Sequence, residues 1–404
     1  MTVLLTGTYS SRNKGDLAMQ LTAARLLQER GATVASCVPF PDLDGSVYAA
    51  AGVEVVPSNR RKLIRASWQL VRLGLWRLTG RRFSWLVGDR NLEPFRRADL
   101  VVDLSGDMLT EDYGPHVAYS HFIPLIKALL LERPLVVLAQ SIGPFRFTRP
   151  LAKAILRRAD LITVRDPVSR DYLLSLGLAA DEVTADLAFA LEPVADERTD
   201  ELWRVLGVTP GAQILGVSVS GLVASHHRKR APGDADFYQE MATALDKFAA
   251  AHEAEIVFFP HVTGPAASKD DRIVAEQVRN LMTGKSLAVV EDLAPAEIKG
   301  MIATTTWFVG CRMHSNIAAL STGVPVAAIA YSHKTLGIMS GLGLQDYVLD
   351  VADVTSDAVA GLLERVVSDA IDIKATLARE MPGHRARAVR NVELALAQME
   401  AGAR

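Results

Sequence analysis

Short apolar runs alternate with amphipathic stretches along almost the whole chain, and no other feature of the sequence constrains the fold as much. The runs at residues 3–6, 33–38 and 134–139 each precede a Gly- or Pro-bearing turn, and helical spacing of apolar residues follows. Strands that are separated by helices form βαβ units and a parallel sheet. The sequence therefore predicts an α/β fold.

Two such series follow one another, and an acidic, proline-containing segment near residues 186–204 separates them. A chain of 404 residues is expected to form two domains. We predict an N-terminal Rossmann-like domain at 1–190, a C-terminal Rossmann-like domain at 205–375, and a helix at 376–404 that crosses back. Ligands of open parallel sheets bind at the carboxyl ends of the strands, so we expect the two domains to face a cleft that holds the site.

Composition narrows the function and the compartment. The 44 basic and 46 acidic residues nearly balance, which argues against general nucleic-acid binding. The two cysteines, Cys37 and Cys311, form no metal-binding pattern, so no metal is expected. The first residues do not resemble a signal peptide, and no apolar stretch reaches the ~18 residues of a membrane span. The sequence predicts a cytoplasmic protein.

One segment departs from this average composition. Residues 59–82 contain eight Arg or Lys residues and no acid, together with Trp68 and Trp76. Such a segment can be a solvated helix that packs its apolar face inward. It can also be a basic helix that lies on an anionic membrane surface, placing the protein peripherally at the inner membrane face, within reach of a lipid-linked acceptor.

Three turns in the first half of the chain carry polar side chains after predicted strands. The loop at 7–16 contains Asn13 and Asp16, and Asp16 either caps the next helix or binds or deprotonates a substrate hydroxyl. Asp107 lies in a carboxylate-rich turn that is either solvated or binds sugar hydroxyls. Gln140 begins a Gly-Pro turn that is either structural or contacts a ligand.

Arg165 follows a predicted strand directly and precedes a helix with Pro167 in its first turn. An arginine at this edge suits a phosphate or a carboxylate, because its planar fork donates two parallel hydrogen bonds. The alternative is an ion pair with Asp166 or Asp186.

The most informative segment spans residues 311–345, which include no Asp or Glu at all. Arg312 and His314 are expected in the turn after a strand, a helix is expected to begin near Ser315, and Lys334 follows the next strand. An uncompensated positive turn at a helix N-terminus is an anion site. For His314 alone, the alternative is a structural histidine.

The ordered set of these motifs resembles the polysaccharide pyruvyl transferases. The set comprises Asn13-x-Gly15-Asp16, Gln140-Ser-Ile-Gly-Pro, Val-Arg165-Asp, Arg312-Met-His314-Ser and Gly323-Val-Pro with Lys334. The chain differs by having Ser105-Gly106-Asp107 where many members have a Gly-Gly-Gly or Gly-Gly-Asp turn. The resemblance implies a GT-B-like fold. It also implies transfer of pyruvate from phosphoenolpyruvate, a co-substrate rather than a cofactor, to two sugar hydroxyls as a cyclic ketal, with release of phosphate.

This resemblance suggests a role for each candidate residue. The C-terminal domain takes the donor side and the N-terminal domain takes the acceptor side. His314 is the expected acid or base, since the ordinary pKa of histidine lies near neutrality. The other expected roles are Asp16 as a catalytic base, donor binding by Arg165, Arg312, Lys334 and Ser315, and acceptor binding by Asn13, Asp107 and Gln140. Two alternatives are a nucleotide-sugar-dependent GT-B glycosyltransferase and a non-catalytic membrane-associated scaffold.

Overall fold

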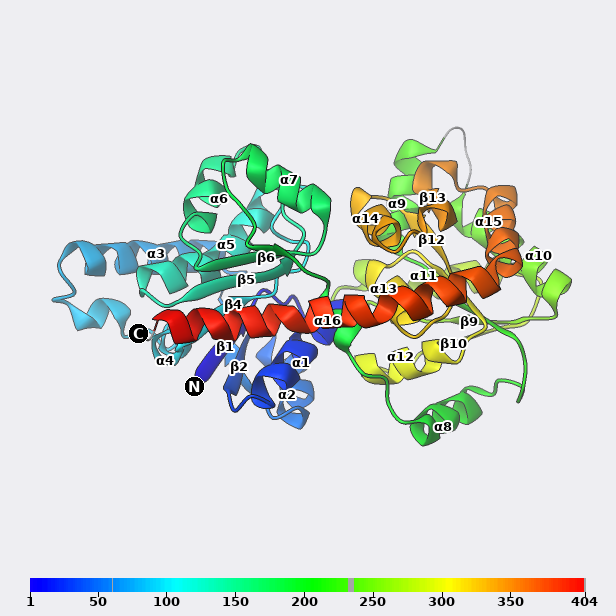
Figure 1. Cartoon of the computed structure of the whole chain (residues 1–404), viewed down its shortest axis with the longest axis horizontal. Helices are drawn as coiled ribbons and strands as arrows, with labels where there is room; N and C mark the ends of the chain where they lie inside the picture. The colour runs from blue at the N-terminus through cyan, green and yellow to red at the C-terminus, as the bar shows by residue number, and fades with distance from the viewer. Residues whose placement is uncertain (60, 232–235, 403–404) are drawn as a thin grey trace. The chain divides into compact units, whose positions relative to one another are not determined.

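A computed structural model describes residues 1–59, 61–231 and 236–402 and divides the chain into two compact units (Figure 1). The N-terminal unit consists of Met1–Ser11, Asp16–Ala190 and the segment from His384 onward. The C-terminal unit consists of Arg12–Gly15 and Leu191–Gly383. A short stretch of the first βα loop therefore belongs to the C-terminal unit.

The N-terminal unit contains a parallel sheet of seven strands in the order β3-β2-β1-β4-β5-β6-β7. The order reverses between β1 and β4, where open α/β sheets bind ligands. The strands are β1 (Thr2–Thr6), β2 (Thr33–Val38), β3 (Glu54–Pro57), β4 (Leu100–Asp103), β5 (Leu135–Gln140), β6 (Leu161–Val164) and β7 (Glu182–Val183). The helices are α1 (Lys14–Gln28), α2 (Pro41–Ala50), α3 (Leu63–Leu78), α4 (Glu93–Arg97), α5 (Pro115–Leu130), α6 (Arg149–Leu156) and α7 (Pro167–Ser175).

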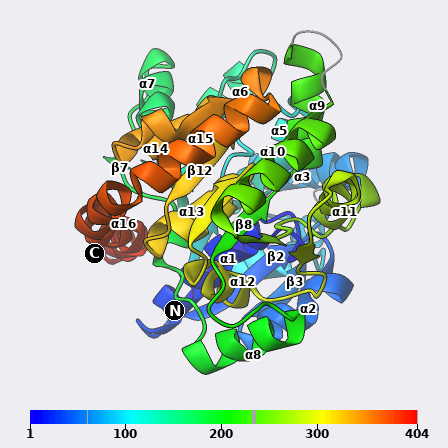
Figure 2. The ribbon, with the colours of Figure 1, turned by 90° about the vertical axis from the view of Figure 1, so that its right-hand side faces the viewer.

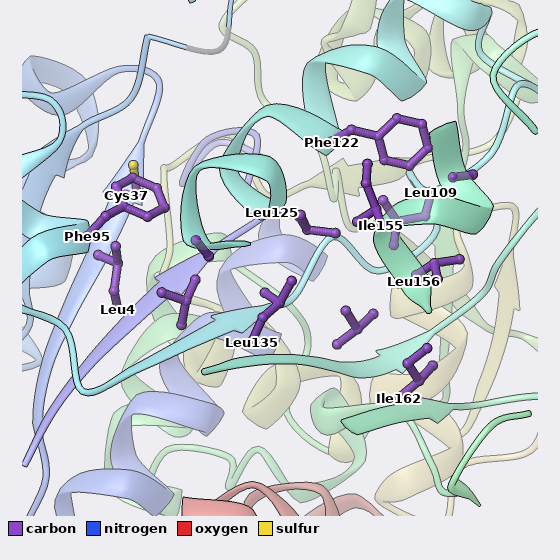
Figure 3. Packing of buried hydrophobic residues seen from close by; sticks show 14 of the residues in the cluster. Leu4, Cys37, Phe95, Leu109, Phe122, Leu125, Leu135, Ile155, Leu156 and Ile162 are labelled. Atoms are coloured by element: carbon purple, nitrogen blue, oxygen red, sulfur yellow. The ribbon is translucent and has the colours of Figure 1, made fainter. Parts of the chain in front are cut away.

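The core of this unit explains why its central strands are apolar runs rather than alternating patterns. Leu4 of β1, Leu135 of β5 and Ile162 of β6 are buried in one cluster with Phe122 and Leu125 of α5 (Figure 3). A parallel sheet that helices cover on both faces buries side chains on both faces.

The C-terminal unit contains a second parallel sheet, of six strands in the order β10-β9-β8-β11-β12-β13. Helix α10 packs against α11 and α15, and α12 packs against α8 and α13 (Figure 2). The strands are β8 (Ile214–Ser218), β9 (Glu255–Phe258), β10 (Ser286–Ala288), β11 (Trp307–Gly310), β12 (Val326–Ala330) and β13 (Val348–Asp350). The helices are α8 (Asp196–Leu206), α9 (Gly221–Arg230), α10 (Phe237–His252), α11 (Asp271–Leu281), α12 (Pro295–Ala303), α13 (Met313–Ser321), α14 (His333–Gly341) and α15 (Ser356–Ser368).

Two parallel sheets with alternating helices confirm the predicted α/β fold with two Rossmann-like domains. The sequence did not predict the edge strands β3, β7 and β13. These strands have two to four residues, most of them partly exposed, so they lack the continuous apolar run that marks a central strand. Among the described helices, none combines the length and the apolar composition needed to cross a bilayer.

The last helix, α16 (Ala370–Gly402), begins in the C-terminal unit and continues into the N-terminal unit. Asn391 fixes the second part of this helix to the sheet of the N-terminal unit. Its Oδ1 accepts hydrogen bonds from the hydroxyls of Thr163, at 2.6 Å, and Thr184, at 2.8 Å, and its Nδ2 donates to the carbonyl of Ala185 at 3.0 Å. Asn391 is completely buried.

We expect Asn391→Leu to lower the free energy of unfolding of the N-terminal unit by about 2–4 kcal/mol, because it leaves buried polar groups without partners. Urea denaturation, together with native-state hydrogen exchange of the β6 amides, measures this change in the free energy of unfolding. Glu400→Leu, at an exposed position of the same helix, is the control and should change stability by less than about 0.5 kcal/mol. Wild-type stability of Asn391→Leu would contradict the anchoring role.

Candidate active site

The junction between β11 and α13 carries two of the predicted site residues. Strand β11 ends at Gly310, Arg312 is the N-cap, and α13 begins at Met313. His314 therefore lies in the first turn of the helix, and its predicted place in the preceding turn was wrong. A side chain at Gly310 would come within 1.8 Å of Asn316 Oδ1, so glycine is required where the helix closes over the strand end.

Arg312 is held by a carboxylate from another part of the sheet. Its Nη2 donates to Asp271 Oδ1 at 2.6 Å and its Nε donates to Asp271 Oδ2 at 3.1 Å. The side chain of Asp271 is 1% exposed and that of Arg312 is 21% exposed. Burial opposes the positive charge, but the Asp271 carboxylate outweighs it and raises the pKa of Arg312. No hydrogen bond engages Arg312 Nη1 within the described part of the chain, so this atom is available to a ligand.

This pairing corrects the prediction of an uncompensated positive turn. The segment 311–345 contains no acid, but Asp271 lies 41 residues before Arg312 in the chain and neutralises it. Sequence reasoning missed Asp271 because the pairing is tertiary. The same carboxylate also accepts backbone N–H bonds from His261, at 3.3 Å, and Val262, at 2.9 Å.

The stretch Arg12–Gly15 brings two further cations to the C-terminal unit. Arg12 Nη1 lies 2.6 Å from Asp292 Oδ2, and Lys14 Nζ lies 2.7 Å from Asp292 Oδ1. The backbone N–H of Lys14 donates to the carbonyl of His261 at 2.9 Å. Burial lowers the pKa of Lys14, although Asp292 opposes the shift. Arg12 and Lys14 lie in the glycine-containing loop at 7–16 that was predicted to approach a ligand. Their position in this loop is the sequence feature that could have identified them.

The imidazole of His314 packs directly on the backbone of Gly15. A β-carbon at position 15 would lie 2.2 Å from His314 Nδ1. His261 is buried nearby, and its pKa falls well below the usual value through burial and through the charges of His314, Arg312 and Lys14. Sequence reasoning did not identify His261.

Ser315 and Lys334 also belong to the predicted donor set. Ser315 Oγ donates to the carbonyl of Arg312 at 2.7 Å, so this hydroxyl closes the first turn of α13. Lys334 is buried in the first turn of α14, directly after β12. Because β11 and β12 are parallel neighbours, the N-termini of α13 and α14 lie at the same edge of the sheet.

Arg165 of the N-terminal unit forms an ion pair with Asp186, which was the alternative prediction for this residue. Its Nη1 bonds Asp186 with both side chains only 1% exposed, and its Nε donates to Ser141 Oγ at 2.9 Å. Burial acts to lower the pKa of Arg165, but the carboxylates of Asp186, Asp107 and Asp166 together raise it. Asp166 instead caps α7, because its Oδ1 accepts from the N–H of Ser169 at 2.7 Å. Within the described residues, Arg165 Nη2 is buried without a hydrogen-bond partner.

In the loop before α1, the helix is capped by Asn13 and not by Asp16, although capping was one of the two predicted roles of Asp16. Asn13 Oδ1 accepts from the N–H of Gly15 at 3.2 Å, which is the bond of an N-cap residue. Asp16 lies inside the first turn of α1, and its Oδ2 accepts from the N–H of Tyr9 at 3.1 Å. Asn13 therefore caps the helix, and Asp16 holds the preceding loop.

The remaining acceptor candidates, Asp107 and Gln140, lie after β4 and at the end of β5. Asp107 Oδ2 accepts from the hydroxyl of Tyr113 at 2.7 Å. Gln140 is fully buried, and its Nε2 donates to the carbonyls of Asp103 and Leu138, both at 3.1 Å. The bond to the Asp103 carbonyl joins β5 to β4, and the bond to the Leu138 carbonyl lies within β5.

A buried hydrogen-bonded chain beside β4 was not predicted. Ser105 Oγ donates to Asp103 Oδ1 at 3.0 Å and lies 3.0 Å from His121 Nδ1. His121 belongs to the apolar helix α5, so no local pattern in the sequence indicates its polar environment. Within residues 1–59, 61–231 and 236–402, no group of three or more His, Cys, Asp or Glu residues could hold a metal ion.

Comparison with known proteins decides the family. The family model described as polysaccharide pyruvyl transferase matches residues 13–333, which is most of the chain. The chain belongs to the polysaccharide pyruvyl transferase family. The predicted site residues of this pyruvyl transferase all fall within the match except Lys334, which lies directly after it.

A curated relative and several solved structures support this picture. The pyruvyl transferase is 26% identical over 310 residues to the amylovoran biosynthesis protein AmsJ of Erwinia amylovora, covering 72% of this chain and 71% of AmsJ. The UDP-GlcNAc 2-epimerase of Neisseria meningitidis superposes with a TM-score of 0.63 at 9% identity, covering 98% of this chain and 100% of that one. HepE of Anabaena, solved with UDP-glucose, gives 0.56 at 15% identity, covering 100% and 99%. Such distant likenesses show the fold alone, and they confirm the GT-B-like class.

We expect Gly15→Ala to displace the His314 ring, because the added β-carbon would overlap it. If His314 is the predicted acid or base, the rate of pyruvyl transfer should fall by about tenfold or more, since small misplacements of such a group are costly. The Cε1–H resonance of His314 and the turnover number measure this. Gly45→Ala in α2 is the control, because nothing lies within 4 Å of a β-carbon there. An unchanged His314 resonance together with unchanged turnover would show that Gly15 does not position the ring.

Proposed function

We propose that this pyruvyl transferase moves the pyruvyl group of phosphoenolpyruvate onto two hydroxyls of a sugar in a glycan or glycolipid. A cyclic ketal forms and phosphate is released. The observation that carries the proposal is the placement of Arg312, held by Asp271, next to His314 at the N-terminus of α13. A guanidinium fork and a helix N-terminus both favour carboxylate and phosphate groups.

The donor residues have separable roles in this proposal. Arg312 offers Nη1, because Nε and Nη2 are engaged by Asp271. Lys334 offers a second cation from the first turn of α14. Ser315 holds the turn through its bond to the Arg312 carbonyl. For Arg165, the atom proposed for donor contact is the buried Nη2.

The chemistry needs an acid, a base and no cofactor. His314 protonates the methylene carbon of phosphoenolpyruvate, and one sugar hydroxyl attacks the neighbouring carbon that bears the phosphate. The bond between that carbon and the phosphate oxygen then breaks, and the second hydroxyl closes the ketal. Of the two hydroxyl protons, one restores the proton that His314 gave away and the other leaves on phosphate. Asp16 and Asp107 are the proposed bases for the hydroxyls.

The acceptor is proposed to be a saccharide or a lipid-linked saccharide, and the compartment to be the cytoplasm. Asn13, Asp107 and Gln140 are proposed to support acceptor binding. Gln140 would act by holding β4 and β5 together rather than by direct contact, because its side chain is fully buried. The name of the relative AmsJ, an amylovoran biosynthesis protein, is compatible with a polysaccharide acceptor.

A phosphate-release screen with phosphoenolpyruvate and a panel of hexosides tests the proposal. Phosphate should appear only with a suitable acceptor, in a one-to-one ratio to a product whose ketal methyl group is visible by NMR. Parallel reactions with UDP-sugars test the glycosyltransferase alternative. Glycosyl transfer from a UDP-sugar, with no phosphate release from phosphoenolpyruvate on any acceptor, would refute the proposal.

We expect His314→Ala to lower the turnover number by at least about a hundredfold, because the donor methylene loses its acid. Phosphate release with acceptor present measures this, and circular dichroism establishes that the variant is folded. The exposed His116→Ala should keep turnover within about twofold. Near-normal turnover of folded His314→Ala would remove His314 from the mechanism.

A further inference from the structure

Helix α3 of the N-terminal unit has two apolar faces, although the unit buries only one of them. Ala66 and Leu73 are buried together with Gln69. Opposite them runs an exposed stripe, spaced alternately by four and three residues, so that its members fall on one side of a helix with 3.6 residues per turn. The stripe consists of Ile64, Trp68, Val71, Leu75 and Leu78, with exposures from 47% to 85%.

The packing of α3 on α5 fixes which face points outward (Figure 1). The hydroxyls of Ser67 and Tyr119 share a hydrogen bond at 2.9 Å, and Arg77 Nη1 donates to the carbonyl of Leu129 at 3.0 Å. At the start of the helix, Asn59 Nδ2 donates to Gln69 Oε1 at 3.0 Å. These bonds lie on the inward side, so the apolar stripe cannot turn into the core without breaking them.

Two aromatic side chains after the helix extend the exposed surface. Phe83 and Trp85 are 47% and 67% exposed, and Arg72 Nη2 donates to the carbonyl of Trp85 at 2.9 Å, which holds this segment against α3. Of the 17 large apolar side chains that are exposed in the described residues, seven therefore lie between positions 64 and 85. We call these seven side chains the α3 patch. Apolar patches of this kind mark interaction sites.

The charges around the α3 patch select the kind of partner. Residues 59–82 contain no acid, and Lys62, Arg65 and Arg82 are exposed. Arg77 and Arg81 pair with Glu132, and Arg60 lies outside the described residues. A second copy of this face would bring like charges together, which is unfavourable. The partner should be anionic and should accept tryptophan side chains.

We propose that the α3 patch binds the surface of a bilayer that contains anionic lipids. A basic helix with Trp and Leu on its apolar face lies in the interface plane, with the apolar side chains below the headgroups and the cations beside them. Tryptophan is enriched at this depth of the membrane. The inference is independent of the pyruvyl transfer reaction.

Vesicle flotation with the full chain tests the proposal. The protein should bind vesicles of phosphatidylcholine with phosphatidylglycerol at low salt, and at least tenfold more weakly either to pure phosphatidylcholine or in high salt. Tryptophan fluorescence should shift to shorter wavelength on binding. Failure to bind the anionic vesicles at low salt would overturn the proposal.

Matched variants locate the binding surface. Trp68→Ser with Leu75→Gln should weaken binding at least tenfold, as should Lys62→Glu with Arg65→Glu. The controls are Phe147→Ser, which is 83% exposed elsewhere on the same unit, and the exposed Arg157→Glu; both should bind within twofold of the wild type. Binding of both patch variants at wild-type strength would overturn the assignment.

Sedimentation in the absence of lipid tests the alternative that the α3 patch is a contact between copies of the chain. The sedimentation coefficient should be the same for the wild type and for Trp68→Ser with Leu75→Gln. Concentration-dependent dimers that this double variant abolishes would show that the stripe is a contact between copies of the chain, and the bilayer proposal would be overturned.

Discussion

The ion pair between Arg312 and Asp271 organises the candidate active site of the C-terminal unit. Asp271 begins the helix after β9 and Arg312 precedes the helix after β11, so the pair spans the end of β8, which lies between these strands. Asp271 also accepts two backbone bonds from the loop that follows β9. That loop in turn accepts the N–H of Lys14, and so places Gly15 against the ring of His314. The position of one carboxylate therefore determines the positions of a guanidinium, a loop and an imidazole.

Such a pair contributes more to position than to stability. The cost of removing two charges from water offsets much of their attraction, whereas removal of one partner leaves an uncompensated buried charge. Arg165 and Asp186 form a comparable pair in the N-terminal unit. Each arginine thus has a carboxylate that fixes its fork and keeps it charged, and each retains one Nη atom that the protein leaves unbonded within the described residues.

Much of the fold could be predicted from the sequence, because central strands of parallel sheets are continuous apolar runs. The run predicted at 33–38 agrees with β2 to the residue. Strands β3, β7 and β13 could not be found, because an edge strand is short and partly exposed. The apolar run that marks a strand arises from burial, so it is missing where a strand is only partly buried.

The candidate site could be predicted only in part. Arg312, His314 and Lys334 could be identified from the sequence because each lies shortly after a predicted strand, and this pattern is local. Asp271 and His261 were not, because their contacts depend on which strands are neighbours in the sheet. The absence of acids in residues 311–345 drew attention to this segment. It did not reveal that Arg312 has a carboxylate partner, Asp271, elsewhere in the chain.

The affinity of Asp271→Asn for phosphoenolpyruvate, measured by calorimetry, tests the central claim most directly. The substitution removes a negative charge beside the proposed anion site, so charge alone predicts tighter binding. If Asp271 acts by positioning Arg312, affinity should instead fall by at least about tenfold. Asp292→Asn removes the same charge from the Arg12 and Lys14 pair and should leave affinity unchanged or higher. Equal or tighter binding by Asp271→Asn would contradict the account.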